Sequence, residues 1–310
     1  MNDKKIIEKI NQDYLEIFNS KEYKLGCALI NIGKGIKKVN IHLLHQNIKL
    51  MLQGIRLQKY NAKGKTHKSP QTYGQDSPTG KTAVYTALFG KYDQIYEPVI
   101  KAENCDYYIF TDQDICNTSV WKKLVLSDQE KSDTAHLTPV EKNRYFKMIG
   151  YKRFNNYKYS IYLDTNIEVY GDLPSLSVYA ANPFGLALYS HPARDCIYNE
   201  AKACIILGKA AKKDVNAQMK RYQSLGMPAH YGMCECGVII RDNLNPTCMK
   251  LMESWWTEFQ KSTVKRDQLI LPYILWRHHI TMQEIGYLDT SIGSNGKFRI
   301  RFHSDTDNCR

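Results

Sequence analysis

The chain has 310 residues, and its hydrophobic content of 43% is enough for one large folded core, which excludes a chain that is disordered throughout. Its formal net charge of +12 is unevenly spread: residues 1–70 hold 14 Lys or Arg against 5 Asp or Glu, and the remainder holds 29 against 26. Because the basic residues gather in one short segment, nucleic acid is disfavoured as a partner. No apolar run reaches the length of a membrane-spanning helix, so we expect a soluble or peripheral protein.

Residues 1–60 are predicted to be a basic, amphipathic helical segment. Apolar residues recur at helical spacing over residues 4–19 and 39–60, and lysines lie around and between these stretches. This composition suits docking on an anionic membrane surface or on a partner protein, and it suits equally a helical subdomain with a solvated basic face. Residues 61–80 are rich in Lys, Ser, Thr, Gly and Pro and are predicted to be a linker.

From residue 81 to 310 strands alternate with helices, which predicts an α/β domain with a mostly parallel sheet covered by helices on both faces. Expected strands lie at 84–89, 107–110, 124–126, 159–163, 184–189 and 237–240. A helix begins at Pro139, with Thr138 as its cap and Glu141 completing a capping box. Further helices are expected at about 196–207, 213–225, from Asn245 onward and at 265–278.

The nine cysteines are odd in number and scattered, and we recognise no signal peptide. This pattern predicts free thiols in a reducing compartment, and therefore a cytoplasmic location, with peripheral attachment to the inner face of the cytoplasmic membrane as a further possibility. Cys234 and Cys236 share one face of a strand, but no second pair completes a zinc site, so buried thiols are the favoured interpretation.

The stretch YSIYLDTN is the centre of the predicted chemistry. Its apolar strand stops at Asp164, and Asn166 projects from the same side two residues later. Two oxygen-bearing side chains at the carboxyl end of a strand are a plausible seat for a divalent cation, Mn²⁺ or Mg²⁺, that holds a diphosphate. His303 is the candidate third metal ligand. The alternative is an ordinary turn, because Asp and Asn are common turn residues.

Other polar residues are candidates for binding a donor with two phosphates. Arg144 and Lys147 lie one helical turn apart and could reach phosphates from one helix face, although they could also be solvated residues of an exposed basic helix. Asp112 follows the second strand, where such folds contact a base or ribose, but a turn-forming role is the stronger default.

Two further stretches concentrate polar groups at element ends. His191, Arg194 and Asp195 fall between a strand and a helix, where backbone donors also point outward. Glu235 lies between small and apolar neighbours, so it is either paired in the core or presented to a ligand. Asp267 begins a helix whose dipole would lower its pKa, which suits hydrogen bonding to a sugar more than proton abstraction.

Several motifs occur together in order: FTD, YSIYLDTN, HPARDCIYNEA, YGMCECGVIIR, and WW followed by KRDQL. Over about residues 82–303 the chain resembles the glycosyltransferase-like family shared by plant wall and mucilage proteins and bacterial surface-polysaccharide clusters. The resemblance implies a GT-A fold, a nucleotide-sugar donor and a divalent metal at a D-x-D-type motif. Asp164 and Asn166 match that motif, with Asn replacing the second Asp. The family's other characteristic polar positions fall on His191, Arg194, Asp195, Glu235, Arg266 and Asp267, with Gln268 following them.

We therefore expect a glycosyltransferase that moves a sugar from a nucleotide-diphosphate sugar, of the UDP type, to a saccharide or lipid-linked saccharide acceptor in surface-polysaccharide assembly. Glu235 is expected near the reacting centre and Asp267 against the donor. The alternatives are a nucleotidyltransferase, for which FGKYDQ is a poor glycine-rich phosphate loop, and a non-catalytic carbohydrate-binding module.

Overall fold

The computed structural model describes residues 80–301, apart from 91–92 and 116–117, together with ten single positions before residue 80. The predicted helical segment 1–60 and linker 61–80 lie almost wholly outside the described residues, and so does His303. The seven cysteines among the described residues are all free thiols, and Cys234 and Cys236 are buried, as predicted. In this part of the chain no helix is long and apolar enough to cross a membrane.

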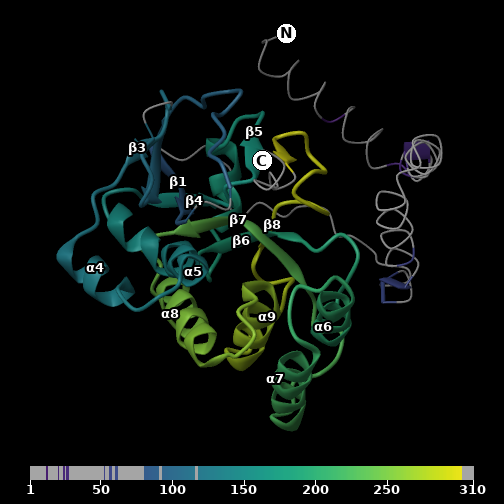
Figure 1. Ribbon diagram of the computed structural model, residues 1–310. Coiled ribbons are helices and arrows are strands. Elements are labelled where there is room, and N and C mark those ends of the chain that lie inside the picture. The colour runs from purple at the N-terminus through teal and green to yellow at the C-terminus, as the bar shows by residue number, and fades with distance from the viewer. Residues whose placement is uncertain are drawn as a thin grey trace, which may run out of the picture.

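A seven-stranded sheet forms the centre of the domain (Figure 1), in the order β3-β2-β1-β4-β7-β6-β8. The strands are β1 Thr82–Leu88, β2 Cys105–Thr111, β3 Lys122–Lys123, β4 Tyr159–Leu163, β6 Leu186–Ser190, β7 Cys234–Asp242 and β8 Gly286–Tyr287. Neighbouring strands pair in parallel except at β7, which is antiparallel to both β4 and β6. The predicted α/β fold with a mostly parallel sheet is confirmed.

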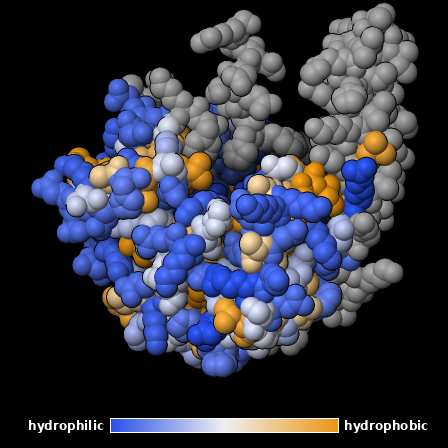
Figure 2. All heavy atoms as spheres, turned by 60° about the horizontal axis from the view of Figure 1, so that its bottom comes forward, coloured by the Kyte–Doolittle hydropathy of each residue, from blue (hydrophilic) through white to orange (hydrophobic). Residues whose placement is uncertain are grey.

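Both faces of the sheet are covered. The helices are α4 Asp128–Thr134, α5 Pro139–Ile149, α6 Ile197–Ile206, α7 Lys212–Ser224, α8 Pro246–Lys261 and α9 Asp267–Arg277. One core joins the sheet to α5, α8 and α9. The other core packs against the 3₁₀ helix η2 (Pro174–Ala180) and the small sheet of β5 (Ile167–Val169) and β9 (Phe298–Ile300), which the sequence pattern did not predict. Figure 2 shows a mainly hydrophilic outer surface on the side of α7, α8 and α9, with apolar side chains scattered among polar ones.

The caps explain where the helices begin. At α5 the hydroxyl of Thr138 accepts from the Glu141 amide at 3.3 Å, and the Glu141 carboxylate accepts from the Thr138 amide at 3.1 Å, as the predicted capping box requires. Helix α4 was missed, although Ser127 and Glu130 form the same box before it. The strand expected at 124–126 is wrong, because the pairing residues are Lys122 and Lys123.

The register of β6 against β7 shifts where the sheet approaches the predicted site. Leu188 pairs with Ile239, but the next residue, Tyr189, pairs with Glu235. The extra residues of β7 form a bulge, and the Gly237 carbonyl inside it accepts the Asp164 amide at 2.8 Å. Because a bulge redirects the side chains of its strand, this irregularity decides what faces the end of β4.

Candidate active site

Asp164 is the first residue after β4, and its backbone forms a turn: the Ile167 amide donates to the Asp164 carbonyl at 3.0 Å. The Thr165 hydroxyl donates at 2.9 Å to the buried carboxylate of Asp93, which lies in the loop after β1. The interpretation of Asp164 to Asn166 as a turn is therefore correct, and metal binding by the same residues stays a prediction. It holds the Asp164 side chain, which is 30% exposed, at the carboxyl end of the parallel strands.

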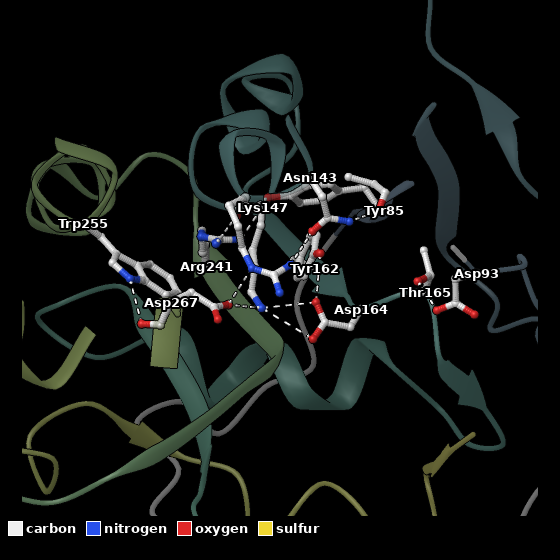
Figure 3. A network of polar contacts seen from close by, with 12 residues as sticks. Tyr85, Asp93, Asn143, Lys147, Tyr162, Asp164, Thr165, Arg241, Trp255 and Asp267 are labelled. Carbon is white, nitrogen blue, oxygen red and sulfur yellow. Dashed lines mark hydrogen bonds and ion pairs between the residues drawn. The ribbon is translucent and has the colours of Figure 1, made fainter. Parts of the chain in front are cut away.

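Lys147, from α5, lies between two carboxylates (Figure 3). Its Nζ is 3.1 Å from Oδ1 of Asp164 and 2.6 Å from Oδ2 of Asp267, and its side chain is only 1% exposed. The Tyr162 hydroxyl donates to the same Asp164 oxygen at 3.0 Å, and the Tyr162 ring lies 5.3 Å from Nζ. The alternative that Lys147 is a solvated residue of an exposed helix was wrong: its ammonium group is buried, and two carboxylates compensate its charge.

Asp267, the first residue of α9, is a buried carboxylate held by cations. Nε of Arg144 lies 3.4 Å from its Oδ2, and the indole of Trp255 donates to its backbone carbonyl at 3.2 Å. Burial by itself raises the pKa of this carboxyl, but the charges of Arg144, Lys147 and Arg266 together outweigh burial and bring the pKa below its ordinary value of 3.8. The predicted direction is confirmed, with neighbouring cations as the cause. An acid this strong is a poor proton acceptor, so Asp267 suits a positioning role.

Among the described residues, the charges of this network do not cancel. Three cationic side chains, Arg144, Lys147 and Arg266, act on Asp267, and Lys147 also contacts a second carboxylate, Asp164. The remaining positive charge is fixed in a buried setting, where electrostatic interactions are stronger than in water. The network can therefore attract an anionic ligand to the exposed side of Asp164.

Arg241 of β7 supports this network through the backbone of Lys147, and it was not identified from the sequence as part of the site. Its fully buried guanidinium donates to the Lys147 carbonyl at 2.7 Å and to the Tyr85 hydroxyl at 2.9 Å. The Asn143 side chain donates to the carbonyl of Ala87 in β1. These bonds fasten α5 at both turns that carry the basic side chains. The signal available in the sequence was an arginine directly after the apolar run Val238–Ile240.

The residues of the D-x-N motif offer a limited donor set for a metal. Oδ1 of Asp164 already receives Lys147 and Tyr162, and the Asn166 amide nitrogen donates to the Arg301 carbonyl at 3.1 Å. Within the described part of the chain no three His, Cys, Asp or Glu side chains are grouped for metal binding. One carboxylate oxygen and one carboxamide oxygen fit Mg²⁺ or Mn²⁺ that takes its other ligands from a diphosphate and water.

Glu235 lies in the bulge of β7. Its Oε2 accepts from the Ile292 amide at 2.6 Å, which ties the segment before β9 to the sheet. A side chain at Gly237 would come within 3.0 Å of the Ile292 side chain, 2.9 Å of the Ile167 side chain and 3.4 Å of Asp164 Oδ2. Glu235 thus anchors a segment that lies beside Asp164. Its assignment as the residue at the reacting centre stays a prediction.

The residues after β6 form a second polar cluster. Nδ1 of His191 accepts from the amides of Ala193 and Arg194 at 3.1 and 3.0 Å, so its proton resides on Nε2, which faces the Glu200 carboxylate at 3.5 Å. Arg194 forms an ion pair with Glu200. Asp195 lies 2.9 Å from Nδ1 of His230. These residues are brought together with one another, and their predicted role in donor binding stays a prediction.

Two of the remaining predicted residues also have structural partners. The Asp112 carboxylate accepts from the Gly90 amide at 3.1 Å and thereby joins the ends of β1 and β2. Gln268 donates to the carbonyl of Cys234 at 3.3 Å, next to Glu235. Asp112 thus ties two strand ends together, and Gln268 ties the start of α9 to the start of β7.

Comparison with known proteins bears on this site. The family model described as "TOD1/MUCI70, glycosyltransferase-like domain" matches residues 58–288. Among solved structures, the bifunctional glycosyltransferase WbbM is similar at 8% identity over 69% of this chain and 40% of WbbM, with a TM-score of 0.39. The galactosyltransferase LgtC, solved with donor and acceptor sugar analogues, is similar at 11% identity over 66% of this chain and 72% of its own, with a TM-score of 0.36. A search of curated proteins found no match.

The mostly parallel sheet covered by helices is the fold class that the resemblance implied. The chain belongs to the TOD1/MUCI70 glycosyltransferase-like family, whose model covers well over half of its length. The match begins at residue 58, so the whole of the expected linker, residues 61–80, lies within the family region. The chain spans 40% of the length of WbbM.

Proposed function

We propose that this protein transfers a sugar from a nucleotide-diphosphate sugar, of the UDP type, to a saccharide or lipid-linked saccharide acceptor in surface-polysaccharide assembly. The observation that carries the proposal is the surplus of fixed positive charge around a partly exposed Asp164 at the carboxyl end of β4. A leaving diphosphate concentrates negative charge as the glycosidic bond breaks, and preorganised cations stabilise that charge.

Each residue of the network has its own part in this reaction. Arg144 is the more exposed of the two α5 cations, with 18% of its side chain accessible, so it is the one able to reach a phosphate. Lys147 is too deeply buried to move outward and acts by fixing Asp164. Asp267 orients both cations and stays ionised. Glu235 is the candidate for taking the acceptor proton. Its bond to the Ile292 amide gives it a second role, which is to position that segment.

We further propose that Mn²⁺ or Mg²⁺ binds at Asp164 and Asn166, with His303 as the third protein ligand. Such an ion supplies Lewis-acid neutralisation of the diphosphate. The exposed edge of the Asp164 carboxylate and the carboxamide of Asn166 are the groups that support this. Lys147 lies closer to Oδ1 of Asp164, at 3.1 Å, than to Oδ2, at 3.5 Å, so Oδ2 is the oxygen better placed to face a metal.

The remaining parts of the proposal concern location. The free thiols among the described cysteines and the basic character of residues 1–70 support a cytoplasmic protein that docks through residues 1–60 on a membrane surface or on a partner. The sequence disfavours nucleic acid as that partner.

The test is a thermal-shift screen of nucleotide sugars with and without Mn²⁺, followed by calorimetry of the best donor. We expect metal-dependent binding that is lost in Asp164→Ala. Asp214→Ala, which removes a half-buried carboxylate at the start of α7, is the matched control and should bind normally. Equal donor affinity in Asp164→Ala and the control would refute the site, and absence of donor hydrolysis or transfer by a protein that binds donor would favour the non-catalytic alternative.

A further inference from the structure

A groove of about 730 Å³ lies on the outer side of the helical layer, between α4 and α8, with α5 beneath it. Tyr145 and Ile149 of α5 line this α4–α8 groove. Arg144 and Lys147, on the same helix, instead reach Asp267. Helix α5 therefore separates the groove from the Asp164 network, so the groove is distinct from the donor site, although Trp256 is the second residue of the WW motif.

Trp256 of α8 is the aromatic residue that a ligand would meet in the groove. Its half-buried ring is held edge-on by Tyr145, with centroids 5.2 Å apart, and lies nearly parallel to Phe259 at 5.5 Å. Two aromatic neighbours restrict the indole to one orientation, so little conformational entropy is lost when a ligand binds it. No described residue accepts a hydrogen bond from its indole nitrogen, so that donor is available to a ligand.

The charged groups that line the groove have partners within the protein. Glu130 pairs with Arg153 and Glu253 pairs with Lys152, both at 2.6 Å. The two oxygens of Asp133 accept from the uncharged Gln129 and Tyr145 side chains, so Asp133 is hydrogen-bonded but keeps its negative charge. The polar side chains that remain for a ligand are Ser132, His136 and Gln260, which offer a hydroxyl, an imidazole and a carboxamide for hydrogen bonding.

We propose that the α4–α8 groove binds a neutral saccharide. The C–H face of a pyranose ring is apolar and matches an indole, while its hydroxyls match hydroxyl, imidazole and carboxamide groups. A phosphate or nucleotide is a poor fit because the lining contains three carboxylates, and its Lys152 is already paired with one of them, Glu253. An amphipathic helix is a poor fit because the floor offers one aromatic cluster and no continuous apolar stripe.

On the proposed transfer reaction, on which this role rests, the groove holds a distant part of the acceptor chain. A second attachment point raises the effective concentration of the chain end at the catalytic site without any new contact to the reacting sugar. The binding itself needs neither donor nor metal, so the groove can be tested separately from the reaction.

The test measures binding of linear hexasaccharides of glucose, galactose and N-acetylglucosamine to the full chain by saturation-transfer NMR and calorimetry, without donor. We expect at least one of them to bind. Trp256→Ala should weaken its affinity about tenfold or more, because the variant removes both the stacking surface and the indole hydrogen-bond donor. The double variant His136→Ala/Gln260→Ala, which changes only exposed side chains, should weaken it in the same direction. Trp276→Ala on α9, a half-buried tryptophan outside the groove, is the matched control and should bind as the unchanged protein does.

Asp164→Ala distinguishes this site from the catalytic one. Retained hexasaccharide affinity in Asp164→Ala, with affinity lost in the groove variants, supports the proposal even if no donor is ever found. Absence of binding of all three hexasaccharides, equal affinity in the groove variants, or loss of binding in Asp164→Ala alone would overturn it. If Trp256→Ala does not fold, the double variant decides.

Discussion

Two polar clusters lie at the carboxyl ends of parallel strands in one sheet, and they differ in how their charges balance. After β6, the charged groups of Arg194 and Glu200 pair with each other, and His191 caps its own turn. After β4, Lys147 is shared between Asp164 and Asp267 and further cations surround the pair. The sequence made the two clusters look alike. From this difference we expect an anion to bind more strongly at the β4 cluster than at the β6 cluster.

The largest expected effect comes from removing the shared cation. Lys147→Met leaves two carboxylates facing each other in a buried setting, which should lower the free energy of unfolding by about 3–5 kcal/mol and abolish transfer. Urea denaturation measures the change in stability, and an assay of sugar transfer from the donor measures the loss of activity. Lys142→Met, on the same helix with a half-exposed side chain, is the control and should change stability by less than about 0.5 kcal/mol. Wild-type stability in Lys147→Met would show that the network is not a coupled unit.

The lowered pKa of Asp267 predicts how the stability of the protein depends on pH. Because its pKa in the folded protein is below the ordinary 3.8, its contribution to stability is complete above that value and is lost as pH falls through the lower pKa of the folded state. Asp267→Asn should cost about 2 kcal/mol at neutral pH. Its deficit relative to the unchanged protein should shrink as pH falls below 3.8. Unfolding measured from about pH 5 to pH 2 checks this, and a deficit independent of pH would remove the carboxylate's charge from the explanation.

A smaller effect is expected where β7 passes Asp164. Gly237→Ala places a methyl group 2.9 Å from the end of the Ile167 side chain, which should cost about 1 kcal/mol and weaken donor affinity by displacing Asp164. Adding Ile167→Val removes the nearer clashing carbon and should restore part of both. If the double variant is no better than Gly237→Ala, the steric account of this position is wrong.

The smallest effect is expected in the β6 cluster. Asp195 and His230 form a partly exposed pair, with 33% and 60% of their side chains accessible, so Asp195→Asn should change stability by less than about 1 kcal/mol. Donor affinity should change less than about twofold, because we expect the donor to bind at the β4 cluster and not beside Asp195. A loss of tenfold or more in calorimetry, roughly 1.4 kcal/mol, would instead place the donor against the loop after β6.

Much of the fold could be predicted because its determinants are local. The capping box of Thr138 and Glu141, the cap at Asn245 and the glycines that end α6 and α7 lie within a few residues of the elements they delimit. The short strands β3, β5, β8 and β9 were not located correctly, because they consist of two or three residues each and exist only through pairing with distant partners.

The candidate site was predicted as a set of residues and not as an arrangement. Asp164, Arg144, Lys147 and Asp267 were all identified, yet neither alternative for Lys147, phosphate binding or solvation, included its burial between two carboxylates, and the bond of Glu235 to the Ile292 amide was not foreseen. Arg241, Tyr162 and Asp93 were not identified as parts of the site. Nothing in the local pattern separates a buried lysine from an exposed one on a helix that also carries other basic residues.

The sequence alone determined the alternation of strands and helices, the caps, and the polar residues at strand ends, because periodicity and capping act between neighbours along the chain. Only the tertiary structure decided which charges meet. Lys147 comes from α5, Asp164 from the end of β4 and Asp267 from α9, so their pairing depends on how the helices pack on the sheet. Whether a charge is solvated, cancelled or left for a ligand is a property of its three-dimensional surroundings, since electrostatic energy depends on distance and burial and not on sequence separation.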